Sequence, residues 1–110
     1  MENTFNKISD RDALQTLISN SNNQPVVVFK HSNSCPISAA AYREMEKLDG
    51  DIVLVEVQTA RDISRELAQI TGVRHESPQV IILRNGRAVW NASHYDVSAQ
   101  AVLAVLQAHR

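Results

Sequence analysis

A run of four apolar residues, Val26-Val27-Val28-Phe29, constrains the fold of this chain more than any other feature. The run is rich in β-branched side chains and apolar at successive positions, so it predicts a strand that is hydrophobic on both faces. Such a strand is typical of the centre of a sheet that helices cover on both sides. The segments before and after it have helical rather than alternating apolar spacing. We therefore expect an α/β fold.

Four segments have the apolar spacing of amphipathic helices. Ser9 and Asp12 resemble a capping box at the start of the first helix, and Gly72 follows the end of the third. The second helix is expected to begin at Cys35-Pro36 and to be closed by Asp49-Gly50. The other three are predicted over residues 10–21, 62–71 and 98–109.

Three further apolar segments predict strands at residues 52–57, 80–83 and 88–92. Asn85-Gly86 is a strong signal for a tight hairpin that joins the last two. The strand, helix and strand between residues 26 and 57 have the length of a right-handed parallel crossover. Residues 5–8 could add an edge strand to this four-stranded sheet. Periodicity alone leaves open whether 80–83 runs parallel or antiparallel to 26–29.

Length and charge limit the possible functions. A chain of 110 residues with 44% hydrophobic residues can build one core, so we expect a single domain over residues 1–110. The formal net charge of -1 leaves no basic surface of the kind that nucleic acids or anionic membranes require. No apolar run approaches the ~20 residues of a membrane span, and the N-terminus lacks the features of a signal peptide. We expect a cytoplasmic protein without nucleic-acid or membrane partners.

Cys35 is the residue on which the chemistry depends. It is the only cysteine, so an internal disulfide is excluded and any disulfide must join another molecule. It stands at the predicted N-cap of a helix, followed by Pro36 at the position where proline is favoured. The free N–H groups of Ile37 and Ser38 and the positive end of the helix dipole would stabilise a thiolate there. This position favours a reactive thiol suited to disulfide exchange over a buried, inert cysteine.

Other cysteine chemistries fit less well. A tyrosine-phosphatase loop needs an arginine six residues after the cysteine, where this chain has Ala41. A papain-like hydrolase needs a larger scaffold and a different cysteine neighbourhood. A zinc site formed by Cys35 with His31, His75 and His94 is a further alternative, but exchange explains the cysteine without a metal.

Three segments resemble the monothiol bacilliredoxin C family, which has the thioredoxin fold. They are Phe29-Lys30-His31-Ser32-Asn33-Ser34-Cys35-Pro36-Ile37-Ser38-Ala39-Ala40-Ala41-Tyr42, His75-Glu76-Ser77-Pro78-Gln79 and Ala88-Val89-Trp90-Asn91-Ala92-Ser93-His94-Tyr95. The resemblance covers most of the chain in order. Ser34 is a departure, because threonine is more common there, although the hydroxyl is retained.

The resemblance implies a sheet order of 52–57, 26–29, 80–83 and 88–92, with 80–83 antiparallel to 26–29. Cys35, Pro78 and His94 would then meet at one edge of the sheet. It further implies a cis peptide bond before Pro78, with backbone groups of Ser77 offered to the incoming disulfide. Ser38 occupies the place where dithiol relatives keep a second cysteine, either solvated or hydrogen-bonded to the Cys35 sulfur.

The resemblance also implies an activity. Cys35 would be the catalytic residue, supported by Pro36, Ser38, Ser77, Pro78 and His94, and would remove a low-molecular-weight thiol from S-thiolated proteins. The family suggests bacillithiol as that thiol, a substrate rather than a bound cofactor. Lys30, His31, Arg74 and His75 are candidate anchors for its carboxylates, although the pattern favours ordinary solvated charges. The alternative function is a non-catalytic thioredoxin-fold module that binds partners or senses oxidation.

Overall fold

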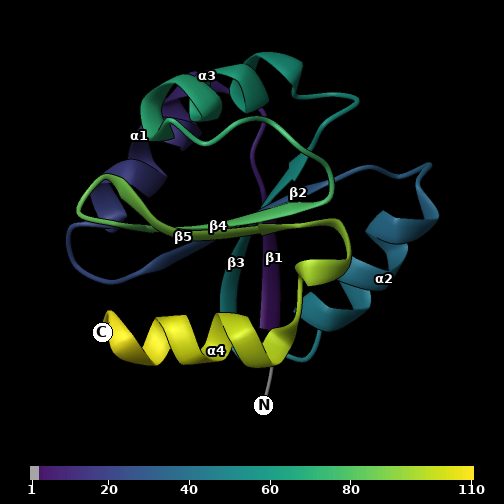
Figure 1. The fold of residues 1–110 in the computed structure, drawn as a ribbon. Coiled ribbons are helices and arrows are strands. Elements are labelled where there is room, and N and C mark those ends of the chain that lie inside the picture. The colour runs from purple at the N-terminus through teal and green to yellow at the C-terminus, as the bar shows by residue number, and fades with distance from the viewer. Residues whose placement is uncertain (1–2) are drawn as a thin grey trace.

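The computed structural model describes residues 3–110, so the first two residues of the expected domain lie outside it. Strands and helices alternate along most of the chain, and a hairpin precedes the last helix (Figure 1). The elements are β1 (Asn3–Lys7), α1 (Arg11–Asn20), β2 (Val26–His31), α2 (Pro36–Met45), β3 (Gly50–Glu56), α3 (Arg61–Thr71), β4 (Gln79–Arg84), β5 (Arg87–Ser93), the 3₁₀ turn η1 (His94–Asp96) and α4 (Ala99–Ala108).

The strands form one mixed sheet in the order β1-β3-β2-β4-β5. β1, β3 and β2 are parallel, whereas β4 pairs antiparallel with β2 and β5 antiparallel with β4. This arrangement confirms the thioredoxin-like sheet and the antiparallel direction expected for residues 80–83. The N-terminal segment is an additional edge strand, because β1 pairs with β3 from Asn3 to Lys7.

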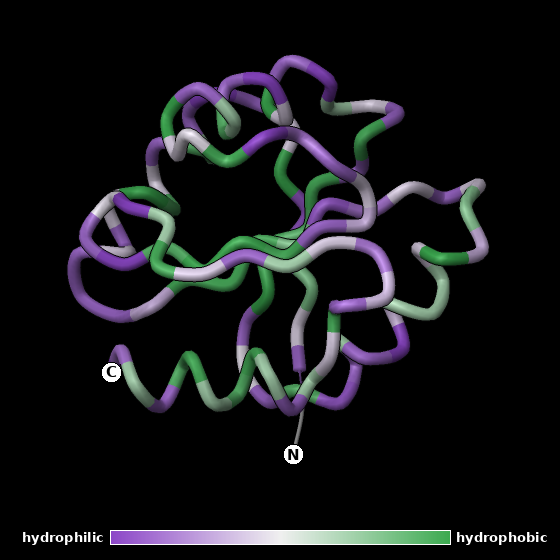
Figure 2. The backbone as a smooth tube through the Cα atoms, in the orientation of Figure 1, coloured by the Kyte–Doolittle hydropathy of each residue, from purple (hydrophilic) through white to green (hydrophobic). Residues whose placement is uncertain are grey.

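The sheet lies between two pairs of helices, with α1 and α3 on one face and α2 and α4 on the other (Figure 1). β2 shows why the Val-Val-Val-Phe run has to be apolar throughout. Val27 and Phe29 face α2 and α4, whereas Val28 faces α1 and α3, as the alternation of a strand requires. In Figure 2 the central strands are accordingly hydrophobic, and the outer turns of the helices carry the hydrophilic residues.

Two helix boundaries differ from the sequence prediction. α2 ends at Met45 and not at Asp49-Gly50, because residues 46–48 continue as a tighter turn in which the Leu48 N–H donates to the Met45 carbonyl. Leu48 still reaches the core, with 5% of its surface exposed, so its burial does not require a longer helix. The N-cap of α1 is Asp10 and not Ser9, and its carboxylate accepts the Ala13 N–H at 2.8 Å.

The hairpin between β4 and β5 has the expected turn. Asn85 and Gly86 have φ values of 56° and 74°, and this pair of positive values defines the type I′ turn that suits the twist of a two-strand ribbon. In the sheet register, Lys30 of β2 pairs with Gln79 of β4, which pairs with Ser93 of β5. The C-terminal ends of β2 and β5 and the N-terminal end of β4 therefore share one edge of the sheet.

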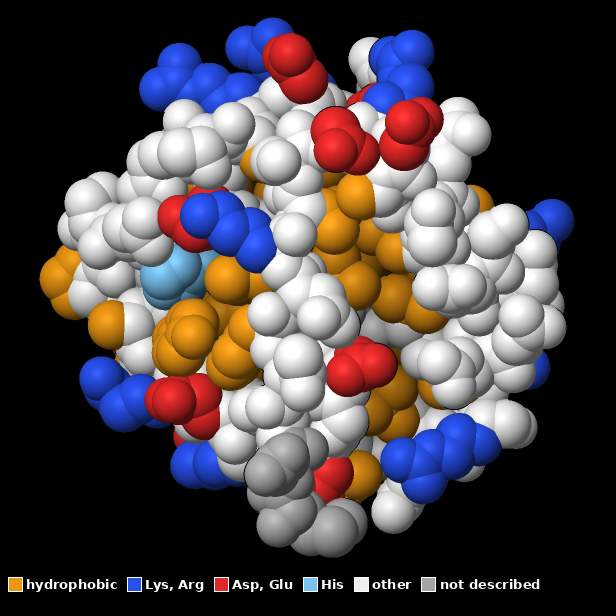
Figure 3. Space-filling model, turned by 180° about the vertical axis from the view of Figure 1, so that it is seen from behind, with side chains coloured by type: hydrophobic (Ala, Val, Ile, Leu, Met, Phe, Trp, Pro, Cys, Tyr) orange, Lys and Arg blue, Asp and Glu red, His pale blue; other side chains and the backbone are white. Residues whose placement is uncertain are grey.

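Basic and acidic side chains alternate over the face shown in Figure 3, with apolar side chains exposed between them. Across residues 3–110, none of the helices is long and apolar enough to cross a membrane.

Candidate active site

Cys35 lies at the N-cap of α2, immediately beyond the loop that follows β2. Its backbone is extended, with φ of -105° and ψ of 123°, and Pro36 opens the helix. The thiol is free and half-buried, and its side chain makes no capping hydrogen bond to the helix. The sulfur is therefore accessible at the positive end of the helix dipole, where negative charge is stabilised.

Ser38 is fully buried and hydrogen-bonded to the loop before the cysteine. Its Oγ accepts the N–H of Ser32 at 3.2 Å, and none of its surface is exposed. The expectation of a solvated serine is therefore wrong, and the structure records no hydrogen bond from this hydroxyl to the Cys35 sulfur. The physical reason is that residue 38 is the third of the helix and points back toward the incoming loop, which needs an acceptor for its free N–H.

The loop of residues 32–34 is fastened to the end of β3. Gln58 Nε2 donates to Ser32 Oγ at 2.8 Å and to Ser34 Oγ at 3.3 Å. Asn33 Nδ2 donates to Glu56 Oε2 at 2.8 Å, and Glu56 also pairs with Lys7. Both hydrogen bonds lower the pKa of Glu56. The bond from Lys7 has the larger effect, and the bond from Asn33 has the next largest. The loop that carries Cys35 is thus held by side chains from another strand.

The segment before β4 provides the second part of the site. The Ser77-Pro78 peptide bond is cis, and Pro78 is buried. The Pro78 carbonyl accepts the N–H of His94 at 2.9 Å, which joins this segment to the end of β5. The side chain of His94 turns to Glu76, with 3.3 Å between Nδ1 and Oε2. Ser77 Oγ is buried and has no hydrogen-bond partner.

Lys30 and Gln79 form a buried polar pair beneath this segment. No sequence pattern indicated that these two side chains pair. Lys30 is fully buried, and its Nζ donates to Gln79 Oε1 at 3.1 Å. Burial lowers the pKa of Lys30 to about 8, against an opposing effect of Glu76. Gln79 Nε2 donates in turn to the Arg74 carbonyl at 2.9 Å and to Ser93 Oγ at 3.4 Å. Because Gln79 bonds across five residues to Arg74, the pair braces the loop that leads to Pro78.

One of the candidate anchors for carboxylates, Lys30, is therefore placed differently from the expectation. Lys30 is neither an anchor nor a solvated charge, because a lysine paired within the sheet cannot reach a ligand at the surface. Arg74 is exposed, and its carbonyl serves the brace described above. His31 packs against Phe29 and Tyr42, with ring centroids 5.5 and 5.2 Å apart, and lines a pocket of about 490 Å³ on the α2 side of the sheet.

His75 lies on the opposite side, in the loop between α3 and β4, and lines a separate pocket against α3. Burial lowers the pKa of His31, and burial together with the charge of Lys30 lowers that of His75. Within the described part of the chain, His, Cys, Asp and Glu residues form no group of three or more that could hold a metal ion.

The structure places the remaining predicted site residues at one edge of the sheet. Cys35 and Pro36 follow β2, Ser77 and Pro78 precede β4, and His94 follows β5. His94 also lines a groove together with Ile37 of the first turn of α2. A free, half-buried thiol at the start of a helix, at one edge of the sheet, is an arrangement that suits thiol-disulfide exchange.

Comparisons with known proteins agree with this geometry. Residues 6–102 match the family described as monothiol bacilliredoxin BrxC. A solved structure of a protein assigned as an oxidoreductase with a thioredoxin fold is 38% identical, with a TM-score of 0.81, and the match covers 91% of each chain.

More distant structures share the fold alone. The thioredoxin of Malassezia sympodialis is 17% identical with a TM-score of 0.74, over 96% of this chain and 90% of that one. The thioredoxin of Fasciola hepatica is 14% identical with a TM-score of 0.74, over 96% and 99%. The family match and the 38% identical structure support a thiol oxidoreductase. The chain belongs to the monothiol bacilliredoxin family of thioredoxin-fold proteins.

Proposed function

We propose that this protein removes a low-molecular-weight thiol from mixed disulfides on other proteins, and that Cys35 is the residue that takes it up. The observation that carries the proposal is the setting of Cys35, a free and half-buried thiol at the start of α2. Residue 38, one helical turn away, is a buried serine, so no neighbouring thiol can expel the cap. A site of this kind has to be loaded and unloaded by exchange with separate thiols.

The reaction consists of two exchanges. In the first, the Cys35 thiolate attacks the sulfur of the small thiol, a new disulfide forms, and the sulfur of the target protein leaves as a thiolate that takes a proton from water. In the second, the thiolate of another small thiol attacks the cap. Cys35 leaves as a thiolate, and the two small thiols form a disulfide with each other. Oxidation of the second small thiol thus balances reduction of the target.

The surrounding residues have separate roles in this scheme. The first-turn N–H groups of α2 stabilise the Cys35 sulfur both as nucleophile and as leaving group. Pro36 fixes the start of the helix, and Ser38 holds the loop through Ser32. The backbone of Ser77, beside Pro78, lies along the incoming disulfide, and His94 supports this segment through its bond to the Pro78 carbonyl.

Membership in the family supports bacillithiol as the first candidate for the small thiol. We propose S-thiolated cytoplasmic proteins as the partners. The exchange chemistry itself works with any small thiol that reaches Cys35. Intact-mass measurement of the protein after exposure to several oxidised small thiols, in turn, would identify the preferred one.

Replacement of Cys35 tests the proposal. Cys35→Ser should abolish removal of the cap from a thiolated test protein, because no other cysteine can replace it. Its thermal unfolding should change little, since the thiol makes no capping hydrogen bond. Activity that survives the substitution would contradict the mechanism. A wild-type protein that accepts one cap but never turns over in the presence of a small thiol would be a redox sensor instead.

A further inference from the structure

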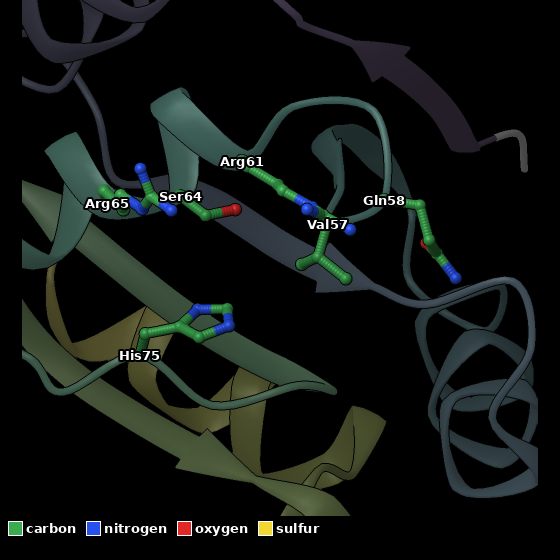
Figure 4. A pocket seen from close by; sticks show the side chains of 6 residues that line it. All are labelled: Val57, Gln58, Arg61, Ser64, Arg65 and His75. Atoms are coloured by element: carbon green, nitrogen blue, oxygen red, sulfur yellow. The ribbon is translucent and has the colours of Figure 1, made fainter.

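A pocket of about 430 Å³ lies against α3, beside the loop that carries Cys35. Val57, Gln58, Arg61, Ser64, Arg65 and His75 line it, with the arginines and Ser64 projecting from α3 and His75 opposite them (Figure 4). Its volume falls in the range of small-molecule sites. The exchange steps described above use neither of the arginines nor Ser64, so these residues have no assigned role.

Two arginines give the pocket a positive wall. Arg61 and Arg65 are four residues apart on α3 and therefore lie on the same side of the helix. Across residues 3–110, no carboxylate comes within 4.0 Å of the Arg61 guanidinium. The Arg65 guanidinium has one carboxylate at 4.0 Å, that of Asp62, whose side chain is almost fully exposed. Both guanidinium groups are thus available to an anion from outside.

Ser64 provides the independent sign of a ligand. Its residue is only 4% exposed, and its Oγ has no hydrogen-bond partner. Figure 4 shows this hydroxyl directed into the space that the other lining residues enclose. A buried hydroxyl without a partner costs stability, so each such group in a native protein requires a physical explanation.

The pocket adjoins the loop that carries Cys35 and the segment that leads into β4. Gln58, on its wall, donates to Ser34 Oγ, and Ser34 is the residue before Cys35. His75, on the opposite wall, stands three residues before Pro78. A small molecule whose sulfur lies at Cys35 could therefore extend across Gln58 into the pocket.

We propose that this pocket binds the carboxylate end of the low-molecular-weight thiol while its sulfur reacts at Cys35, so that acidic small thiols are the preferred caps. This inference rests on the proposed function and names its substrate class. The planar guanidinium groups of Arg61 and Arg65 match a carboxylate through paired hydrogen bonds. The carboxylate also gives the Ser64 hydroxyl its missing hydrogen-bond partner. Val57 contacts the apolar part of the small thiol.

The first test compares two caps on one test protein, the acidic thiol glutathione and the neutral thiol 2-mercaptoethanol. Arg61→Gln/Arg65→Gln should lose about 10- to 100-fold in kcat/KM for the acidic cap, because two charge-assisted contacts are removed. The neutral cap should change less than about twofold. Arg87→Gln/Arg110→Gln removes the same charge from exposed arginines outside the pocket and should leave both rates unchanged. Equal losses on both caps, or none, would overturn the proposal.

The second test measures binding without catalysis and so separates failure of this inference from failure of the proposed function. Malate, a small dicarboxylate, is titrated into Cys35→Ser while backbone amide NMR signals are recorded. Saturable shifts at Ser64 and His75 are expected, and they should vanish when Arg61→Gln/Arg65→Gln is added. Absence of shifts at these amides would contradict the pocket, whatever the de-capping assay shows. Tighter binding of inorganic phosphate than of malate would overturn the carboxylate assignment.

Ser64→Ala separates a ligand-binding hydroxyl from a structural one. The variant should unfold at a higher temperature, because a buried hydroxyl without a partner is removed. It should also bind malate about threefold more weakly. A lower unfolding temperature together with unchanged malate binding would show that Ser64 serves only the fold.

Discussion

Lys30 shows how one buried charge can brace a segment of the active site. Its Nζ has a single side-chain partner, Gln79, and the pKa of Lys30 is lowered from its ordinary value of 10.5 to about 8 because the protonated form loses its hydration. A pKa difference of this size means that the free energy of protonating Lys30 differs by about 3 kcal/mol between the folded and unfolded states. The same Gln79 side chain also donates to the Arg74 carbonyl and so holds the loop that leads to Pro78.

The protonation of Lys30 predicts a pH dependence of stability. Between pH 8 and 10.5 the unfolded chain binds this proton more tightly than the folded protein, so the free energy of unfolding should rise with pH across this window. Lys30→Met lacks the group, so the wild type should gain up to about 3 kcal/mol relative to the variant between these limits. Urea unfolding of both proteins at pH 7.5 and about 10.5 measures the gain. A constant difference between them would show that Lys30 is not desolvated.

The position of Cys35 can be predicted from the sequence, whereas the burial of Lys30 cannot. The position of Cys35 follows from local signals, a strand followed by a short loop and Pro36 at the start of a helix. The burial of Lys30 depends on its pairing with Gln79, 49 residues away, in a strand whose direction periodicity does not give. A lysine at a strand end is usually exposed, so nothing local indicated its role.

At the scale of elements, the first turn of α2 decides whether the site works with one thiol or two. Cys35 is the N-cap and Ser38 the third helical residue, so their side chains lie within one turn. The Ser38 hydroxyl faces the Ser32 N–H, which places residue 38 on the inner side of the loop. A thiol there would act at a high effective concentration on a capped Cys35.

Ser38→Cys should therefore convert the protein into a dithiol. After oxidation by a small disulfide, its intact mass should fall below that of the reduced protein by the mass of two hydrogens, as an internal disulfide forms and the small thiol leaves. Ser38→Ala is the matched control: it should keep a stable cap on Cys35 and lose about 1–3 kcal/mol of stability, because the Ser32 N–H loses its acceptor. A stable Ser38→Cys protein with caps on both cysteines would mean that residue 38 cannot reach Cys35.

Helix α3 was predicted almost to the residue, yet its function was not. Arg61 and Arg65 have the spacing of an ordinary solvated helix face, and no sequence pattern distinguishes that from one wall of a pocket. Ser64 gave no signal either, because its burial depends on how α3 packs in the folded molecule. The end of α2 was missed for a related reason, since Leu48 fitted the helical spacing although a turn delivers it to the core.

At the scale of the whole molecule, the order of the strands produces the site. Cys35, Pro78 and His94 are far apart in the chain, and the antiparallel pairing of β4 with β2 and β5 brings the segments that carry them to one edge. The hydrophobic pattern predicted the strands, but only the family resemblance supplied the direction of β4. We propose that, at this edge, Cys35 takes up the small thiol itself and releases the target protein.

A single-turnover mass measurement follows the transfer of the cap to Cys35. The reduced protein is mixed with an equal amount of a singly capped target, in the absence of any free thiol, and both intact masses are followed with time. We predict that the target loses the mass of one cap while this protein gains it, with no covalent complex between the two proteins accumulating. A target–protein disulfide that accumulates with release of the free small thiol, or a target that loses its cap while Cys35 stays unmodified, would show that Cys35 does not take up the cap.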